Sequence, residues 1–236
     1  MGDSTISAGD TSGAVGGVDG CRAGWLLVRL GPAGEARVDI VDRFNGLPLR
    51  GLAMVAVDMP IGLPDSGARG CDAMARALLQ PERRSSVFLH LRRPLLGYAD
   101  YQAANAWGKG DGKGISKQAW NILPRIAELD AWMTPARQRR VRESHPEVIF
   151  IGLNGGAPLP KKRTREGMVA RRAVLLRHGF AGIDALAADL PRRGAALDDL
   201  YDAAALALAA RRFAAGKGRQ LGGQRDSRRL RMEIWV

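Results

Sequence analysis

Short apolar runs separated by tight turns occupy the first sixty residues of the sequence. Residues 15–19 form an apolar run that ends in an acidic residue, and a glycine-spaced turn leads from it into the apolar run 25–30. After a second turn, residues 36–44 alternate between apolar and polar side chains, as a half-buried strand does. Residues 52–57 are continuously apolar, which is typical of a strand buried on both faces. The pattern predicts an antiparallel meander of three strands followed by a buried fourth strand.

Helical spacing of the apolar residues becomes common in the second half of the chain. Residues 116–133, 166–180 and 198–215 are predicted helices, and the last of them has the most regular pattern. Residues 141–150 between these helices favour an extended strand-like segment, and residues 232–236 favour an edge strand. Strands and helices that follow one another in this way predict an α/β protein.

Regular spacing is lost between residues 65 and 115, which we interpret as an insertion after the fourth strand. A chain of 236 residues is suited to one domain with room for such an insertion. We therefore expect a single domain over residues 15–236. Residues 1–14 are rich in small and polar residues and lack the segments of a signal peptide, so we expect a disordered tail. No apolar run approaches the ~20 residues of a membrane span, which predicts a protein that does not interact with membranes.

The net charge is +12, from 36 lysines and arginines against 24 acidic residues. Basic residues recur in clusters, and a broadly basic face would attract nucleic acid through its phosphates. An ordinary solvated surface is the alternative interpretation. The two cysteines lie fifty residues apart and the chain has only three histidines, which argues against disulfides or a zinc site and favours a cytoplasmic protein.

Two aspartates follow the apolar runs of predicted strands and precede residues that interrupt pairing. Asp19 is followed by Gly20, and Asp58 is followed two residues later by Pro60, so both acids are expected at the rim of the sheet. Turn formation and capping are the ordinary alternatives for either acid. Because Asp58 comes directly after four apolar residues, burying it is costly unless it is paired or bound to a metal ion.

The predicted helix 198–215 carries two more aspartates on the face that packs against the sheet. At 100° per residue, Asp199 and Asp202 lie within about 40° of the direction of Leu206. An acid in the first turn is also an ordinary partner of the helix dipole, which accounts for Asp199 but less well for Asp202 on an apolar stripe. Glu143 is the fifth candidate acid. An all-carboxylate set indicates Mg²⁺ or Mn²⁺, and two such ions ~4 Å apart can drive phosphodiester hydrolysis.

Four motifs in this order resemble a known family. They are GVDGCRAGW, VAVDMPIGLP, RESHPEV and DDLYDAAALALA, and the chain ends in RLRMEIWV. Together they resemble the predicted RNase H-like nucleases, a family catalogued as a domain of unknown function of the DUF429 type. The resemblance covers nearly all of residues 15–236. It implies a ribonuclease H-like α/β fold with a five-stranded mixed sheet, whose first three strands are antiparallel, flanked by helices.

A more distant similarity to RuvC-type Holliday junction resolvases implies roles for individual residues. Asp19, Asp58, Asp199 and Asp202 match the metal-binding acids of those enzymes, with Asp19 expected to bridge two Mg²⁺ or Mn²⁺ ions. Glu143 matches a glutamate that precedes a proline and is expected to lie near the ions as a further catalytic acid. The basic loop beyond it is expected to bind nucleic acid through Lys161, Lys162, Arg163 and Arg165. The insertion 65–115 has no counterpart in the resolvases.

The leading hypothesis is therefore a two-metal nuclease whose substrate, DNA or RNA, stays open. A protein that binds nucleic acid or regulates without turnover is the first alternative. A relative of the actin-like phosphotransferases is the second, although the second copy of the fold and the second glycine-spaced hairpin of those proteins are not found in the sequence. The sequence leaves the oligomeric state open, a dimer included.

Overall fold

The predicted antiparallel meander forms the first half of the central sheet. The computed structural model describes residues 13–188 and 190–236, so most of the predicted tail lies outside the described residues. β1 (Val15–Cys21) pairs with β2 (Gly24–Leu30), and β2 pairs with β3 (Ala36–Val41), in both cases antiparallel. The third strand is three residues shorter than predicted, because Phe44 begins the 3-10 turn η1 (Phe44–Gly46).

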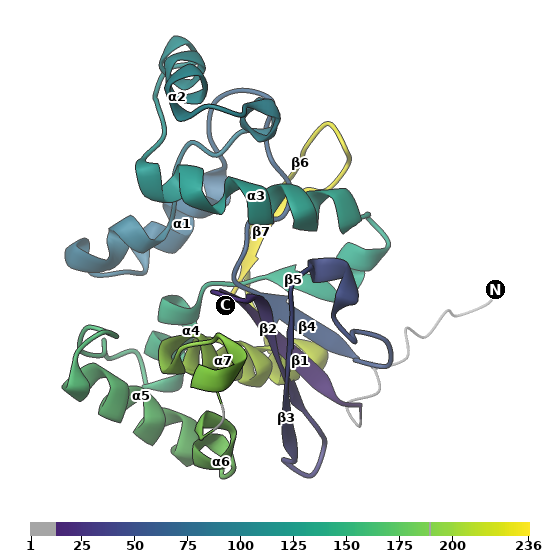
Figure 1. The fold of residues 1–236 in the computed structure, drawn as a ribbon, viewed down its shortest axis with the longest axis vertical. Coiled ribbons are helices and arrows are strands. Elements are labelled where there is room, and N and C mark those ends of the chain that lie inside the picture. Colours follow the sequence, from purple (N-terminus) through teal and green to yellow (C-terminus); the bar gives the residue numbers. More distant parts are fainter. Residues whose placement is uncertain (1–12, 189) are drawn as a thin grey trace, which may run out of the picture.

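Two parallel strands complete the sheet on the other side of β1. β4 (Met54–Val57) pairs with β1, and β5 (Val141–Glu143) pairs with β4. The strand order is β3-β2-β1-β4-β5 (Figure 1). The predicted α/β class, with a five-stranded mixed sheet flanked by helices and an antiparallel first half, is confirmed.

The prediction of an extended segment over residues 141–150 is wrong beyond Glu143. Pro146 begins the helix α4 (Pro146–Leu153). Proline suits the first position of a helix, where its missing N–H has no partner to lose and its fixed φ is already helical. α4 is buried around most of its circumference, so its β-branched and other apolar residues show no helical stripe that would distinguish it from a strand.

One face of the sheet is covered by α7 (Leu197–Ala214), which packs against β1, β4 and β2. Gly17 allows this close approach, since a side chain there would overlap the backbone of Ala203 and Ala207. The Ala-rich turns of α7 are buried along most of their length, because the helix packs closely against the sheet. The rest of this layer is α4, α5 (Arg165–Arg177), α6 (Ile183–Ala187) and η5 (Pro191–Arg193).

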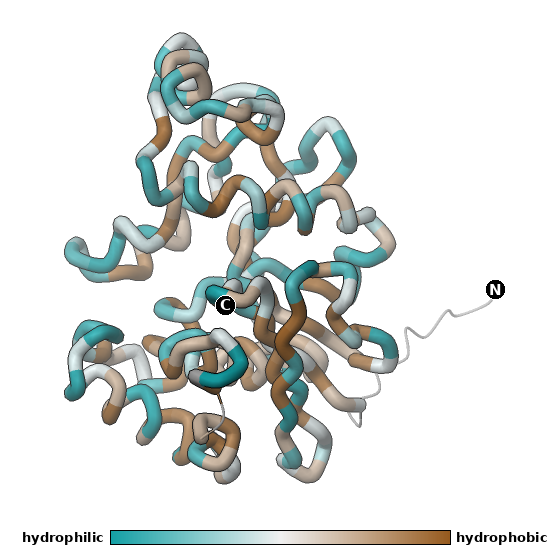
Figure 2. The backbone as a smooth tube through the Cα atoms, viewed as in Figure 1, coloured by the Kyte–Doolittle hydropathy of each residue, from teal (hydrophilic) through white to brown (hydrophobic). Residues whose placement is uncertain are grey.

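The opposite face is covered by α3 (Lys117–Trp132), which carries Pro124 within it. Trp25 of β2 packs edge-on against Phe44, and Phe44 packs in the same manner against Trp132, with ring centroids 5.0 and 5.1 Å apart. Figure 2 shows hydrophobic residues gathered along the strands beneath this layer. The remaining elements on this side are η3 (Arg93–Gly97), α2 (Tyr101–Gly110) and η4 (Arg137–Arg139).

The last strands form a separate hairpin instead of an edge of the main sheet. β6 (Gln220–Arg225) pairs with β7 (Arg231–Trp235), and only a single bridge, from Ser144 to Trp235, connects β7 to the end of β5. The hairpin packs against α1 (Gly70–Ala77), which is followed by η2 (Pro81–Ser86). Within the described residues, the helices are too short or too polar to cross a membrane.

Candidate active site

Asp19 and Asp58 lie side by side because β1 and β4 are parallel neighbours. Val18 and Val57 are partners in this pairing, and the N–H of Asp58 donates to the carbonyl oxygen of Val18 at 3.0 Å. Side chains alternate between the two faces of a strand, so the residues after Val18 and Val57 both turn away from the α3 side. Asp19 is buried and Asp58 is half-buried.

α7 brings two further aspartates to this edge of the sheet. Because Gly17 contacts α7 at Ala203, the first turns of the helix lie beside Asp19, two residues further along β1. Asp202 is 2% exposed, and its Oδ1 has no hydrogen-bond partner. Asp199 is half-buried, and its Oδ2 accepts a hydrogen bond from the N–H of Ala196 at 2.9 Å, which satisfies the first turn of the helix.

Lys162 places a positive charge in this group of acids. Its Nζ donates to Asp202 Oδ2 at 2.7 Å and lies 3.9 Å from Asp198 Oδ2. The loop that carries it is held on one side by the buried Arg171, which donates to the carbonyl oxygen of Pro160, and on the other by Thr164, which caps α5. Of the four basic residues expected to bind nucleic acid, Lys162 alone reaches the acids, while Lys161, Arg163 and Arg165 are exposed.

The acids disfavour one another's ionised forms. Burial, followed by the repulsion of Asp58 and Asp202, raises the pKa of Asp19 well above its usual range. Burial also raises the pKa of Asp58 to about 7 and that of Asp202 to about 6, although Lys162 opposes both shifts. Burial lowers the pKa of Lys162, but the attraction of Asp202, Asp19 and Asp58 outweighs it and leaves that pKa above its usual range. Perturbed acids of this kind are typical of functional sites.

Glu143 belongs to the other face of the sheet. It pairs with Val57 in the β4–β5 ladder, so its side chain leaves the sheet on the side of Val57 instead of that of Asp58. There its Oε2 accepts from the guanidinium of Arg69 at 2.5 Å and from the N–H of Ile61 at 2.7 Å. Burial raises its pKa to about 8 although Arg69 opposes this. Glu143 is therefore held in an ion pair with Arg69, as Asp202 is with Lys162, but on the other face of the sheet.

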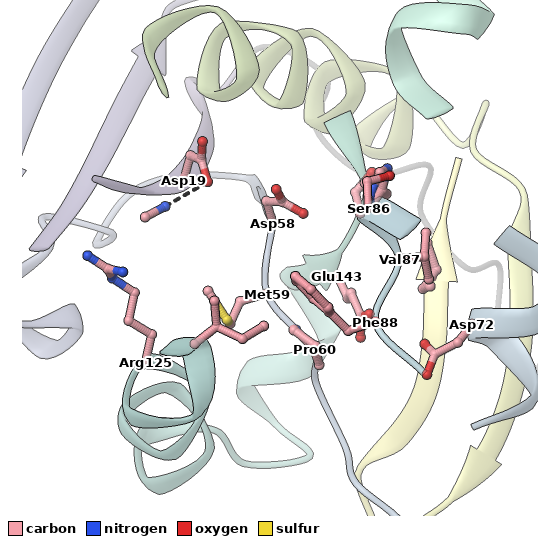
Figure 3. A pocket seen from close by; sticks show the side chains of 15 residues that line it. Asp19, Asp58, Met59, Pro60, Asp72, Ser86, Val87, Phe88, Arg125 and Glu143 are labelled. Atoms are coloured by element: carbon pink, nitrogen blue, oxygen red, sulfur yellow. Dashed lines mark hydrogen bonds between the residues drawn. The ribbon is translucent and has the colours of Figure 1, made fainter. Parts of the chain in front are cut away.

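Two adjoining cavities open beside the acids. The narrow cavity, of about 160 Å³, is lined by Asp19, Asp58, Glu143 and a mixture of apolar and polar side chains (Figure 3). The open cavity, of about 500 Å³, is lined by Asp58, Asp202 and a number of polar and charged side chains. Its cations are Arg83, Lys162 and Arg163. The two cavities share a wall formed by Asp58, Ser86, Phe88, Ile122 and His145.

Several residues of these cavities were not singled out by sequence reasoning. Glu147 lies in the open cavity, where its Oε1 accepts from Arg171 at 2.5 Å and lies 3.6 Å from Arg83. Arg125 of α3 borders the narrow cavity and donates to the carbonyl oxygen of Cys21. Glu147 follows the proline that begins α4 at the end of a strand, and this position is the one local signal that could have found it. Arg83 and Arg125 depend on tertiary packing and leave no local signal.

The donor set matches the chemistry of a hard divalent cation, with oxygen ligands from Asp19, Asp58 and Asp202 and an unpartnered carboxylate oxygen on Asp202. In the described part of the chain, however, no group of three or more acidic, histidine or cysteine side chains is arranged to hold a metal ion. The cation in contact with Asp202 is instead the ammonium of Lys162. The ligand chemistry therefore fits a divalent ion, and an ion bound at Asp202 Oδ2 would take the place of the ammonium of Lys162.

The fold and site define an α/β protein with a cluster of carboxylates at one edge of a five-stranded mixed sheet. A family model described as "Protein of unknown function (DUF429)" matches residues 17–227, and the chain belongs to this family. Searches for similar curated proteins and similar solved structures found no match. The matched residues include all five predicted acids and the basic loop.

Proposed function

We propose that this protein is a divalent-metal-dependent nuclease with a ribonuclease H-like fold. One observation carries the proposal: the carboxylates of Asp19, Asp58 and Asp202, from two adjacent strands and one helix, lie close enough to affect one another's pKa. Asp58 and Asp202 also line a cavity together with basic side chains. The antiparallel first half of the sheet and the parallel strands after it are in keeping with the proposed fold. Carboxylates that raise one another's pKa are stabilised in their ionised form by a bound Mg²⁺ or Mn²⁺.

Asp58, Asp202 and Asp199 all raise the pKa of Asp19, which indicates that Asp19 lies near each of them. In this proposal Asp19 would hold both ions, and the other three aspartates would supply their remaining ligands. Bound divalent ions supply an activated water and stabilise the leaving oxygen of a phosphodiester. Lys162 and Arg163, at the open cavity, would hold the phosphates of the substrate. Glu147 keeps its negative charge neutralised by Arg171 and would not repel that substrate.

A second candidate function is nucleic-acid binding without turnover. It is favoured by one observation, the 2.7 Å contact between Lys162 Nζ and Asp202 Oδ2, because an internal ammonium can neutralise the acids without a metal ion. Binding that depends on salt, persists in EDTA and yields no product would support this candidate.

The experiment that tests the nuclease is cleavage of single-stranded, duplex, hybrid and branched nucleic acids with Mg²⁺ or Mn²⁺. Asp19→Asn is expected to lower the rate at least about a hundredfold, since it removes the central ligand charge. Asp184→Asn is the matched control, because Asp184 is exposed on α6 and forms an ion pair with Arg172 on the surface. The proposal fails if none of these nucleic acids is cut, or if Asp19→Asn cuts them as fast as the native chain.

A further inference from the structure

The narrow cavity is a lined pocket in its own right, next to Asp19 and Asp58. Its walls are largely apolar, and Phe88 and Ile122, both half-buried, separate it from the open cavity. In Figure 3, Asp19 and Arg125 lie toward one side of the pocket, Asp72 and Val87 lie toward the other, and Phe88 lies between them. The apolar residues that line it are Met59, Pro60, Val87, Phe88, Ile122 and Ile234.

Two of the polar side chains that line the narrow cavity have a buried atom without a hydrogen-bond partner. Asp72 is 2% exposed, and its Oδ2 has no hydrogen-bond partner, whereas its Oδ1 lies 3.6 Å from Arg69 and accepts from the thiol of Cys71. His145 Nδ1 also has no partner. A buried polar atom without a partner is costly, and one that borders a cavity can be satisfied by a ligand. These atoms have no role in the proposed hydrolysis.

The size of the narrow cavity restricts what can enter it. Its volume of about 160 Å³ lies below the roughly 300 Å³ at which pockets for drug-sized molecules begin. The lining combines the ring of Phe88 and aliphatic side chains with hydrogen-bonding and charged side chains, among them four carboxylic acids. Enzymes that hold one nucleobase removed from its stack likewise combine contact with aromatic or apolar side chains and hydrogen bonds to the edge of the base. The cations of the open cavity, on the other side of the shared wall, suit the charged backbone of the same strand.

We infer that the narrow cavity binds a single unstacked nucleobase beside the bond to be cut, while the strand's backbone occupies the open cavity. This inference rests on the proposed nuclease function and adds the substrate class: a single strand, or a duplex with an unpaired nucleotide. A base in a continuous duplex cannot reach the cavity without being unpaired and unstacked. Asp58, which borders both cavities, lies where the base and its phosphate would meet.

Asp72 supplies the pocket with a hydrogen-bonding carboxyl group. Burial raises the pKa of Asp72, whereas Arg69, 3.6 Å from Oδ1, favours the ionised form, in which Oδ2 only accepts hydrogen bonds. Every unpaired nucleobase presents an N–H donor on its Watson–Crick edge, which is an exocyclic amino group in adenine, cytosine and guanine and a ring N–H in thymine and uracil. Asp72 therefore suits an unpaired base without selecting one of them.

The first test compares substrates with the full chain and Mn²⁺. A single strand, and a duplex with one bulged nucleotide, should be cut at least about tenfold faster than the fully paired duplex, since stacking and unpairing oppose entry of the base. Removing the base at the cut site, by an abasic nucleotide, should slow cleavage about tenfold. Equal rates on the paired duplex and the single strand, or no effect of the abasic site, would overturn the inference while leaving the nuclease proposal intact.

The second test compares pocket variants and separates the two proposals. Phe88→Ala should remove most of the difference between the intact and the abasic strand, and Val169→Ala, at an exposed position of α5, should keep it. If no nucleic acid is cut, the nuclease proposal fails. Binding of dye-labelled strands to the Asp19→Asn chain then shows whether the narrow cavity holds a base. An intact strand that binds about tenfold more tightly than its abasic copy supports the pocket. Equal binding contradicts it.

Discussion

At the residue scale, the position of each clustered acid depends on one backbone relation. Asp19 and Asp58 are neighbours because the pairing of Val18 with Val57 continues through the N–H of Asp58. Side chains alternate between the two faces of a strand, and a helix repeats about every 3.6 residues. These two periods let the sequence predict that Asp58 and Asp202 lie near Asp19. They do not reveal the face of Glu143, because β5 has only three residues and its register is set by β4.

The raised pKa values predict how the stability of the metal-free protein depends on pH. A carboxyl whose pKa rises from 3.8 to about 7 on folding, as for Asp58, binds its proton more tightly in the folded state. The free energy of unfolding therefore falls as pH rises from about 4 to about 7, and Asp202 adds to this fall up to about pH 6. Chemical unfolding in EDTA across this range should show the fall, and Asp58→Asn should reduce it. A free energy of unfolding that rises from about pH 4 to about pH 7 in the native chain, or that falls equally in Asp58→Asn, would contradict the prediction.

Lys162 offers a second prediction at this scale. Lys162→Met leaves Asp202 buried without its partner and should lower the free energy of unfolding by about 1 to 2 kcal/mol in EDTA, a value reduced because the lysine side chain is 35% exposed. Mn²⁺ should then stabilise Lys162→Met more than the native chain, since it no longer competes with an ammonium. Lys161→Met, at the exposed neighbouring position, is the control. Equal stabilisation of the variant and the native chain by Mn²⁺ would argue against competition.

At the element scale, the site depends on the contact between α7 and β1. The regular helix and the glycine-containing strand were both predictable from local pattern, but their close approach at Gly17 required the tertiary structure. The same limit explains α4, whose buried apolar run has no polar face to mark a helix. The same limit applies to Lys162, because its contact with Asp202 of α7 joins two residues that are 40 positions apart in the sequence.

Gly17→Ala tests the contact between α7 and β1. The added methyl group overlaps the backbone of Ala203 and Ala207, so α7 must move away from the strand, and we expect a loss of at least about 2 kcal/mol in the free energy of unfolding. Gly152→Ala in α4 is the matched control, because its methyl group would meet nothing within 4 Å and alanine is the better helix former. The control should be unchanged or more stable by about 0.5 to 1 kcal/mol. Equal stability of Gly17→Ala and the native chain in urea unfolding would contradict the packing.

At the scale of the whole molecule, charge and cavities act together. The excess of basic residues was evident in the sequence, but the sequence did not show which of them lie beside the acids. The fold places only a few there, because the open cavity forms where the loop before α5, the turn η2 and α3 meet. The basic composition accounts for general attraction to nucleic acid, and these few cations account for where a strand would lie.

The salt dependence of nucleic-acid binding tests this division. Arg163→Ala should weaken binding of a single strand and reduce the slope of log affinity against log salt by about 1, because one phosphate contact is lost. Arg37→Ala, at an exposed position of β3 outside both cavities, should change the slope less. Fluorescence anisotropy over a range of salt concentrations measures both slopes. Equal slopes for Arg163→Ala and the native chain would exclude Arg163 from the interface.

The central claim is that the carboxylates at the edge of the sheet hold divalent ions. The most direct measurement is a crystal structure of the native chain with Mn²⁺, with anomalous scattering recorded to locate manganese. The account predicts two manganese peaks among Asp19, Asp58, Asp199 and Asp202, with the ammonium of Lys162 no longer in contact with Asp202 Oδ2. Crystals with no manganese among these residues, and with Lys162 still bound to Asp202, would contradict it.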